Sequence, residues 1–191
     1  RITLKWSKFV GGHMYGKCNR NSPINLLSNF QILSYNTNHM THSTNTDQEN
    51  CIFCKIVSGE VPANKVYEDD ETIAFLDIQP VNPGHTLVIP KDHFENIYTT
   101  PVLTWVRMQM TAQKIALAIK NSLDADGINI VMNNEAPAGQ VVPHAHIHVI
   151  PRNEKDGLVH WPHSLYKDET EASSIAEKIA TELEIDVEPA V

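Results

Sequence analysis

The chain has few cysteines and no long apolar run, and both shortages restrict what kind of protein it is. Its three cysteines, Cys18, Cys51 and Cys54, are too few and too unevenly placed for the disulfide framework of a secreted domain. No apolar stretch approaches the roughly 20 residues of a membrane span, and Arg1 to Cys18 lacks the apolar core of a signal peptide. We therefore expect a soluble, cytoplasmic protein that does not enter a membrane.

Basic side chains are also in short supply. The chain has 15 Lys and Arg against 23 Asp and Glu, a formal net charge of −8. A protein that follows the backbone of DNA or RNA neutralises many phosphates with cationic side chains. The charge therefore argues against a nucleic-acid polymer as partner, but it permits a single nucleotide, which needs only a local site.

Acidic residues are absent from residues 1–46, which hold five basic side chains and so carry +5. The rest of the chain has ten basic and 23 acidic residues, or −13. Residues 36–50 are polar, rich in Asn and Thr, and without apolar periodicity, which is typical of a disordered linker. Because the chain begins with Arg1 and Met40 precedes the first apolar block, we expect the natural start near Met40, with residues 1–39 an extension.

These patterns divide the chain into three parts. We expect a disordered or non-native leader over residues 1–49, one domain over 50–152, and a C-terminal extension over 153–191 that contains an amphipathic helix. Strand-like runs surround one long helical pattern, with no repeated βαβ spacing, which predicts an α+β fold with a mainly antiparallel five-stranded sheet. The expected strands are Lys65–Tyr67, Thr72–Leu76, Thr86–Ile89, Ile128–Met132 and Val141–Ile150, and the expected helices are Pro101–Asn121 and Glu171–Leu183.

Three histidines alternate in the last of these strands. In a β-strand alternate residues share a face, so His144, His146 and His148 form a row while the residues between them face the core. A solvated polar face is one explanation, and a metal site built from all three is another, since imidazole is a common ligand. With 10 histidines in 191 residues such a triplet is rare by chance, so we favour a catalytic row.

The residues around this row resemble the histidine-triad (HIT) family, Hint-like branch. The matching motifs are Gly139-Gln140 before the histidines, Asn133-Asn134 further upstream, and Gly-His-Thr-Leu-Val-Ile-Pro-Lys from Gly84 to Lys91. The resemblance runs from Cys51 to Arg152, and it implies a HIT-like fold and a nucleotide hydrolase or transferase. Gly139 also permits close backbone approach, as an anion-binding loop requires.

The resemblance implies a nucleotidyl-histidine mechanism. His146 attacks the α-phosphorus, and water then hydrolyses the intermediate; a neutral imidazole suits this role because its Nε2 is nucleophilic at pH 7. His148 contacts the phosphate or passes a proton to the leaving group, His85 assists that relay, and His144 completes the triad.

The resemblance also implies a nucleotide site. Gln140 and the amides of Val141 and Val142 hold the phosphate oxygens, Asn134 lies at the phosphate and ribose, and Asp77 binds the ribose hydroxyls. Val141 departs from the family, where many members have Ser or Thr; the lost hydrogen bond, about 1 kcal/mol, affects leaving-group preference more than activity. The positions that match those enclosing the base, for which core packing is the alternative, are Phe53, Ile56, Phe75, Leu76 and Ile78.

Cys51-Ile52-Phe53-Cys54 has the spacing that lets two thiolates reach one tetrahedral zinc. A redox motif shares this spacing, but the βαβ context of a thioredoxin-like site is missing; a pair of free buried thiols is the other alternative. The resemblance to zinc-bearing members suggests a structural Zn²⁺ held by Cys51, Cys54, His93 and His144.

The favoured activity is hydrolysis of a nucleoside phosphoramidate or a related nucleoside monophosphate conjugate, with a purine base. The alternatives are hydrolysis of dinucleoside polyphosphates and a non-catalytic nucleotide-binding module stabilised by zinc.

We expect a homodimer through the helix Pro101–Asn121 and the strand Ile128–Met132. These two segments have more apolar surface than one small sheet can cover. His160-Trp161-Pro162 resembles a family segment that lies near the partner's active site, although Trp161 packed on its own subunit is the alternative.

Overall fold

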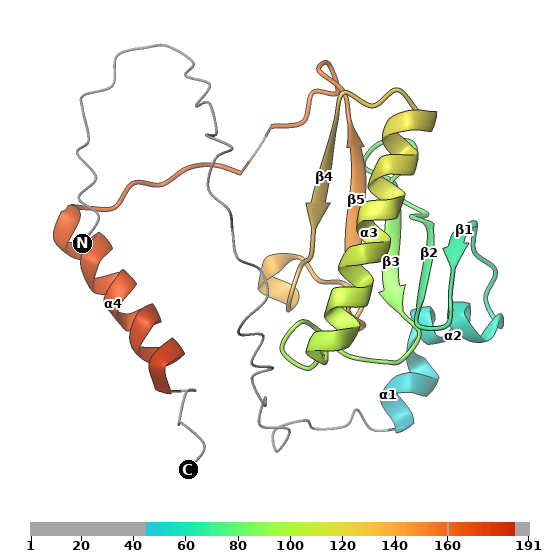
Figure 1. Ribbon diagram of the computed structural model, residues 1–191, viewed down its shortest axis with the longest axis horizontal. Helices are drawn as coiled ribbons and strands as arrows, with labels where there is room; N and C mark the ends of the chain where they lie inside the picture. The colour runs from blue at the N-terminus through green and yellow to red at the C-terminus, as the bar shows by residue number, and fades with distance from the viewer. Residues whose placement is uncertain (1–44, 160, 186–191) are drawn as a thin grey trace, which may run out of the picture. The chain divides into compact units, whose positions relative to one another are not determined.

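The computed structural model describes residues 45–159 and 161–185 (Figure 1). Residues 1–44, with Met40 and most of the expected leader, lie outside the described residues, as does His160. Within the described ranges no helix has the length and apolar character needed to cross a membrane. The helices are α1 (Asn45–Asn50), α2 (Ile52–Ser58), α3 (Val102–Ser122) and α4 (Glu169–Ile185), and the strands are β1 (Lys65–Glu68), β2 (Thr72–Leu76), β3 (Thr86–Pro90), β4 (Gly127–Val131) and β5 (Ile147–Arg152).

The five strands form one antiparallel sheet in the order β1-β2-β3-β5-β4, and α3 lies along it (Figure 1). This confirms the predicted α+β class with one long helix. The first two strands, β1 and β2, form a hairpin, and Asp69 closes its turn by accepting the backbone N–H groups of Glu71 and Thr72. The expected C-terminal helix is present as α4.

Strand alternation gives the sheet two apolar faces. On one face Val88, Ile147 and Val149 are fully buried and pack with residues of α3 such as Met108 and Ala112. On the other face Ile73, Phe75, Leu87 and Ile89 pack with Phe53 and Ile56 of α2. Each fully buried large side chain contributes about 1.5–3 kcal/mol. His148 pairs with Leu87 across β5 and β3, and it therefore lies on the α2 side, away from α3.

Two short helices differ from the sequence-based expectation. Residues 45–49, expected to be disordered, belong to α1, and its end is closed by the Cys51 N–H donating to Gln48 O at 3.2 Å. The helix α2 was not expected because seven residues are too few for a clear periodic pattern. It buries Phe53 and Ile56, which are three positions apart, and it ends at Gly59, whose φ of 80° suits a left-handed cap.

The last strand begins later than expected. β5 starts at Ile147 rather than Val141, so His144 and His146 precede the strand, and only His148 lies in it. Pro143 has no backbone N–H, and the N–H of Ala145 donates to Phe94 O at 2.6 Å instead of to a neighbouring strand. The prediction of a three-histidine strand was therefore wrong in its backbone, although Ala145, Ile147 and Val149 do face the core.

Candidate functional site

The histidines expected to act together meet at the β2–β3 turn and the start of β5. Asp77 follows β2, His85 precedes β3, and the Asp77 N–H donates to His85 O at 2.9 Å, which draws the two residues together. Because Leu87 pairs with His148, His85 also lies beside β5. The Nε2 of His85 is 2.9 Å from Nδ1 of His148, and the rings of His146 and His148 are 4.9 Å apart.

His146 has its ring orientation fixed by the backbone. Its Nδ1 lies 2.6 Å from the carbonyl oxygen of His144. A carbonyl only accepts hydrogen bonds, so Nδ1 carries the proton, and Nε2 of the neutral ring has a free lone pair. His146 is 5% exposed, which excludes the alternative of a solvated polar face for this residue; packing against Phe53, with ring centroids 5.3 Å apart, covers it.

The pair His85–His148 is ordered in the same way. The Val81 N–H donates to Nδ1 of His85 at 3.3 Å, so the proton of the neutral His85 ring is on Nε2 and donates to Nδ1 of His148. The neutral His148 ring then carries its own proton on Nε2. The result is a chain of oriented protons that ends on a half-buried imidazole.

Burial keeps these rings neutral. Burial, together with the neighbouring His146 and His85, lowers the pKa of His148 from 6.5 to about 4. Burial also lowers the pKa of His85 and of His146, and the carboxylate of Asp77 partly opposes both shifts. At pH 7 the group therefore offers a nucleophilic nitrogen and a proton donor rather than a cluster of cations.

The loop before the histidines is shaped to receive an anion. The Gln140 side chain accepts the Glu135 N–H at 2.7 Å and donates to Glu95 O at 2.6 Å and Val142 O at 3.0 Å, so it holds the loop closed. Among the described residues, none accepts a hydrogen bond from the amides of Val141 and Val142. Gly139 adopts φ 93°, which L side chains rarely adopt.

Glu135 in this loop is strained. Its φ of 69° and ψ of 158° lie in a region that is essentially restricted to glycine and costs about 1–3 kcal/mol. Two bonds hold it there, because its N–H donates to Gln140 and its carbonyl accepts the Gln140 N–H. Strain of this kind, kept by surrounding bonds, is common where a loop is fixed for binding.

The remaining residues expected to contact the nucleotide are each held by bonds or packing of their own. Asn134 accepts the Ile97 N–H at 2.8 Å through its Oδ1, and Asp77 accepts the Gln79 N–H at 2.8 Å through its Oδ1. The expected base-enclosing residues differ in exposure: Phe53, Ile56 and Phe75 belong to the core, Leu76 is half-buried, and Ile78 is 94% exposed.

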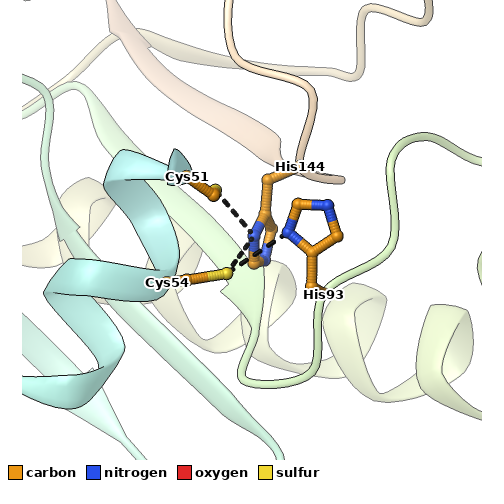
Figure 2. Close-up of side chains that lie close together, drawn as sticks. All are labelled: Cys51, Cys54, His93 and His144. Atoms are coloured by element: carbon orange, nitrogen blue, oxygen red, sulfur yellow. Dashed lines mark hydrogen bonds between the residues drawn. The ribbon is translucent and has the colours of Figure 1, made fainter. Parts of the chain in front are cut away.

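A second cluster adjoins the first. Cys51 precedes α2 and Cys54 lies on it, and Figure 2 shows both facing the rings of His93 and His144. The Cys54 Sγ is 3.2 Å from Nδ1 of His93 and 3.6 Å from Nδ1 of His144, and the Cys51 Sγ is 3.5 Å from that same nitrogen. The four ligand atoms all lie within 4.8 Å of one another.

This cluster fits a tetrahedral metal. Bond lengths of about 2.3 Å to sulfur and about 2.1 Å to nitrogen imply sulfur–nitrogen separations of about 3.6 Å. The His144 Nε2 lies 3.0 Å from Pro90 O, so Nε2 donates and Nδ1 turns its lone pair toward the thiols. Burial, with Cys51 nearby, raises the pKa of the Cys54 thiol to about 12, and a bound cation reverses such a shift. The site can therefore hold a metal ion.

Several groups of the site were not predicted from the sequence. They are the backbone atoms that orient the rings: the carbonyls of Pro90 and His144 and the amide of Val81. Every residue has such atoms, so residue identity carries no signal for them. Pro90 after a β-branched run was the one available hint, because it marks where β3 ends.

A sheet of this order, with one long helix and a histidine row beside a glycine loop, defines the histidine-triad class. A model of the HIT domain matches residues 58–155. Protein hit of Bacillus subtilis (strain 168) is 46% identical over 140 residues, which is 70% of this chain and 97% of that protein. The chain belongs to the HIT domain family.

Other relatives agree with this assignment. Adenylylsulfatase HINT3 of Arabidopsis thaliana is 44% identical over 115 residues, 60% of this chain and 58% of that protein. The crystal structure of SMU.412c from Streptococcus mutans UA159 is similar with a TM-score of 0.68 and 42% identity, over 75% of this chain and 89% of that one. A Zn-bound histidine triad family protein from Mycobacterium smegmatis has a TM-score of 0.57 and 38% identity, over 70% and 99%.

Proposed function

We propose that this protein cleaves nucleoside monophosphate conjugates through a nucleotidyl-histidine intermediate on His146. The observation that carries the proposal is the 2.6 Å bond from His146 Nδ1–H to the His144 carbonyl, which leaves a neutral ring with its Nε2 lone pair available. The Nε2 attacks the α-phosphorus, the bond from phosphorus to the leaving group breaks, and the leaving group takes a proton. Water then attacks the phosphorus and releases the nucleoside monophosphate and the free ring.

His148 is the proton donor in this scheme. Its ring is beside His146, and its Nε2–H is the end of the chain that starts at the Val81 amide and passes through His85. The leaving group takes the Nε2 proton of His148, and the water that later attacks the phosphorus returns a proton to that nitrogen. His85 holds the His148 ring through its Nε2–H, and His144 orients the nucleophile.

The amides of Val141 and Val142 bind the phosphate oxygens, because the loop leaves both of these donors available near its glycine. The Gln140 side chain acts on the phosphate indirectly, since its amide group already holds the loop. Asn134 and Asp77 contact the phosphate and ribose, and the base lies against the Phe53 and Phe75 side, with Leu76 and Ile78 at its rim and Ile56 behind. A purine fits this apolar surface.

The substrate class that we favour is a nucleoside phosphoramidate or a related conjugate of a purine nucleoside monophosphate. The name of the Arabidopsis relative, an adenylylsulfatase, supports an adenylyl group on the nucleophile. Hydrolysis of dinucleoside polyphosphates uses the same nucleophile, and it is the alternative that the experiment below separates.

We assign zinc to the cluster of Cys51, Cys54, His93 and His144. Two thiolates and two neutral imidazoles around a divalent cation give a neutral site, as a buried position requires. The zinc-bound relative from Mycobacterium smegmatis supports this choice. The four protein ligands leave no open position, so the metal's contribution is to hold the fold.

A second copy of the chain is the proposed partner of the α3 and β4 surface. β4 is an edge strand, and Val106, Met110 and Ile130 are 44%, 48% and 47% exposed there. A symmetric pairing would cover both the edge and the apolar surface. A hollow of about 470 Å³ on this surface is lined by Trp105, Val106, Gln109, Met110, Gln113 and Ile130.

The function is tested by incubating the protein with adenosine phosphoramidate and, separately, with diadenosine polyphosphates. Release of AMP is measured for the wild type and for His146→Ala. We expect faster AMP release from the phosphoramidate, and none from either substrate with the variant. Equal rates for wild type and variant would remove the proposal, and a preference for the polyphosphates would move it to the alternative.

A further inference from the structure

The sheet does not hold the segment that carries His146. The residue pairs of β5 begin at Ile147 with β3 and at His148 with β4, so residues 142–146 lie outside both ladders. A short segment without ladder bonds is expected to move unless other contacts fix it. What fixes the nucleophile must therefore be sought elsewhere.

Two of its contacts reach the last residue of β3 and the loop that follows it. The Ala145 N–H donates to Phe94 O at 2.6 Å, and His144 Nε2–H donates to Pro90 O at 3.0 Å. His93 lies between these two acceptors in sequence, and it faces Cys54 in the metal cluster. The loop and the histidine segment are therefore joined twice by backbone acceptors and once through the cluster.

The helix α2 supplies the third side of this arrangement. Phe53 stands between the two cysteines in sequence, and its ring packs edge-on against both His144 and His146, with centroids 5.8 Å and 5.3 Å apart. The thiols hold α2 against His144, and Phe53 then covers the nucleophile. Disruption of the cluster would loosen the packing of Phe53 on His146 and also the loop that follows β3.

His144 connects the two clusters within one residue. Its ring directs Nδ1 to both cysteine sulfurs, and its carbonyl oxygen accepts the Nδ1–H of His146. The ring and the carbonyl of His144 belong to one residue, so a backbone shift of His144 away from the thiols would move both. The hydrogen bond that orients the His146 ring would then change.

We propose that His144 is a positioning residue that transmits the occupancy of the Cys51, Cys54, His93 and His144 cluster to the ring of His146, so that turnover depends on the cluster more strongly than nucleotide affinity does. The inference rests on the proposed function for its kinetic part. Its structural part, the link between the cluster and the orientation of His146, concerns the protein without substrate.

Two of the proposed nucleotide contacts do not depend on the cluster, because other bonds fix them. Asp77 is held by the Gln79 N–H and Asn134 by the Ile97 N–H, and neither bond involves a residue of the cluster. Emptying the cluster should therefore lower kcat by a larger factor than it weakens AMP binding, to which Phe53 and the Val142 amide also contribute. A purely structural site would weaken both by the same factor.

The test compares zinc-loaded and chelator-treated wild-type protein by NMR, without substrate. We expect the Ala145 amide to exchange at least about ten times faster without metal, about 1.4 kcal/mol of lost protection, and the Nδ1–H signal of His146 to disappear. The amides of Val149 and Ile150 inside β5 are the control and should not change. Zinc should restore both signals, and kcat should follow them while AMP affinity changes by a smaller factor than kcat.

A matched pair of variants covers the case in which chelation unfolds the chain. His93→Ala leaves three ligands and should show the same losses, and His93→Cys, which restores a four-ligand set, should recover them. Unchanged Ala145 exchange in metal-free protein would overturn the proposal, and so would a parallel loss of AMP affinity. Because the exchange measurement needs no substrate, it stands even if the proposed substrate class is wrong.

Discussion

The two histidine clusters share one short segment but have opposite surroundings. His144, at one end, is fully buried among two thiols and the ring of His93, with both ring nitrogens engaged. His148, at the other end, is half-buried, and its Nδ1 contacts His85. In our proposal one sequence motif therefore serves two purposes: His144 helps to hold a metal ion, and His148 takes part in the reaction. His146 lies between them and depends on both.

The largest effect should come from His146→Ala. We expect turnover to fall at least a hundredfold, about 2.7 kcal/mol of barrier, because the attacking nitrogen is gone. Metal content should remain that of the wild type. Because His146 is buried, circular dichroism must first show that the variant is folded. A folded variant that keeps more than a tenth of the rate would contradict the role of His146.

Replacing Cys54 with Ser should separate the closed cluster from the open one. We expect loss of zinc and a fall in Tm of about 10 °C, since metal-binding free energy is also folding free energy. Ser58→Ala on the same helix is the matched control and should keep both. Metal analysis and calorimetry measure the two quantities. If the Tm of Cys54→Ser equals that of the wild type, the cluster does not stabilise the fold.

The fold was largely predictable, because β-branched runs and one long periodic helix fix the sheet and α3. The start of β5 was not, because a strand pattern at His144 and His146 does not reveal that the Ala145 amide bonds to Phe94. The four metal ligands were predicted as one set and lie together in the structure. The burial of His146 was missed, since it depends on Phe53 of a helix too short to detect.

A smaller effect is expected for Asp77→Asn, which sharpens the separation between binding and chemistry. The variant retains an oxygen to accept the Gln79 N–H but loses the charge that we propose to face the ribose. We expect the dissociation constant of AMP to rise about tenfold, or about 1.4 kcal/mol, by titration calorimetry. Asp70→Asn, in the exposed hairpin turn, is the control. Equal affinities for the two variants would remove Asp77 from the site.

The smallest effect is the pH dependence of stability that arises from the open cluster. A histidine in the unfolded chain titrates at about 6.5, whereas burial lowers the pKa of His148 to about 4. The unfolded chain therefore binds the proton first, so the contribution of His148 is complete above pH 6.5 and is lost as the pH falls toward 4. Urea unfolding of wild type and His148→Asn should converge in this window. A constant difference would show that His148 is not buried as a neutral ring.

The central claim is that His146 carries the nucleotidyl group. Rapid mixing of the protein with adenosine phosphoramidate, followed by acid-free quenching and peptide mass spectrometry, tests it most directly. We predict an adenylyl group on the peptide that contains residues 144–148, with fragment ions that place it on His146, and no adduct in His146→Ala. An adduct on His148 or His85, or turnover without any adduct, would contradict the account.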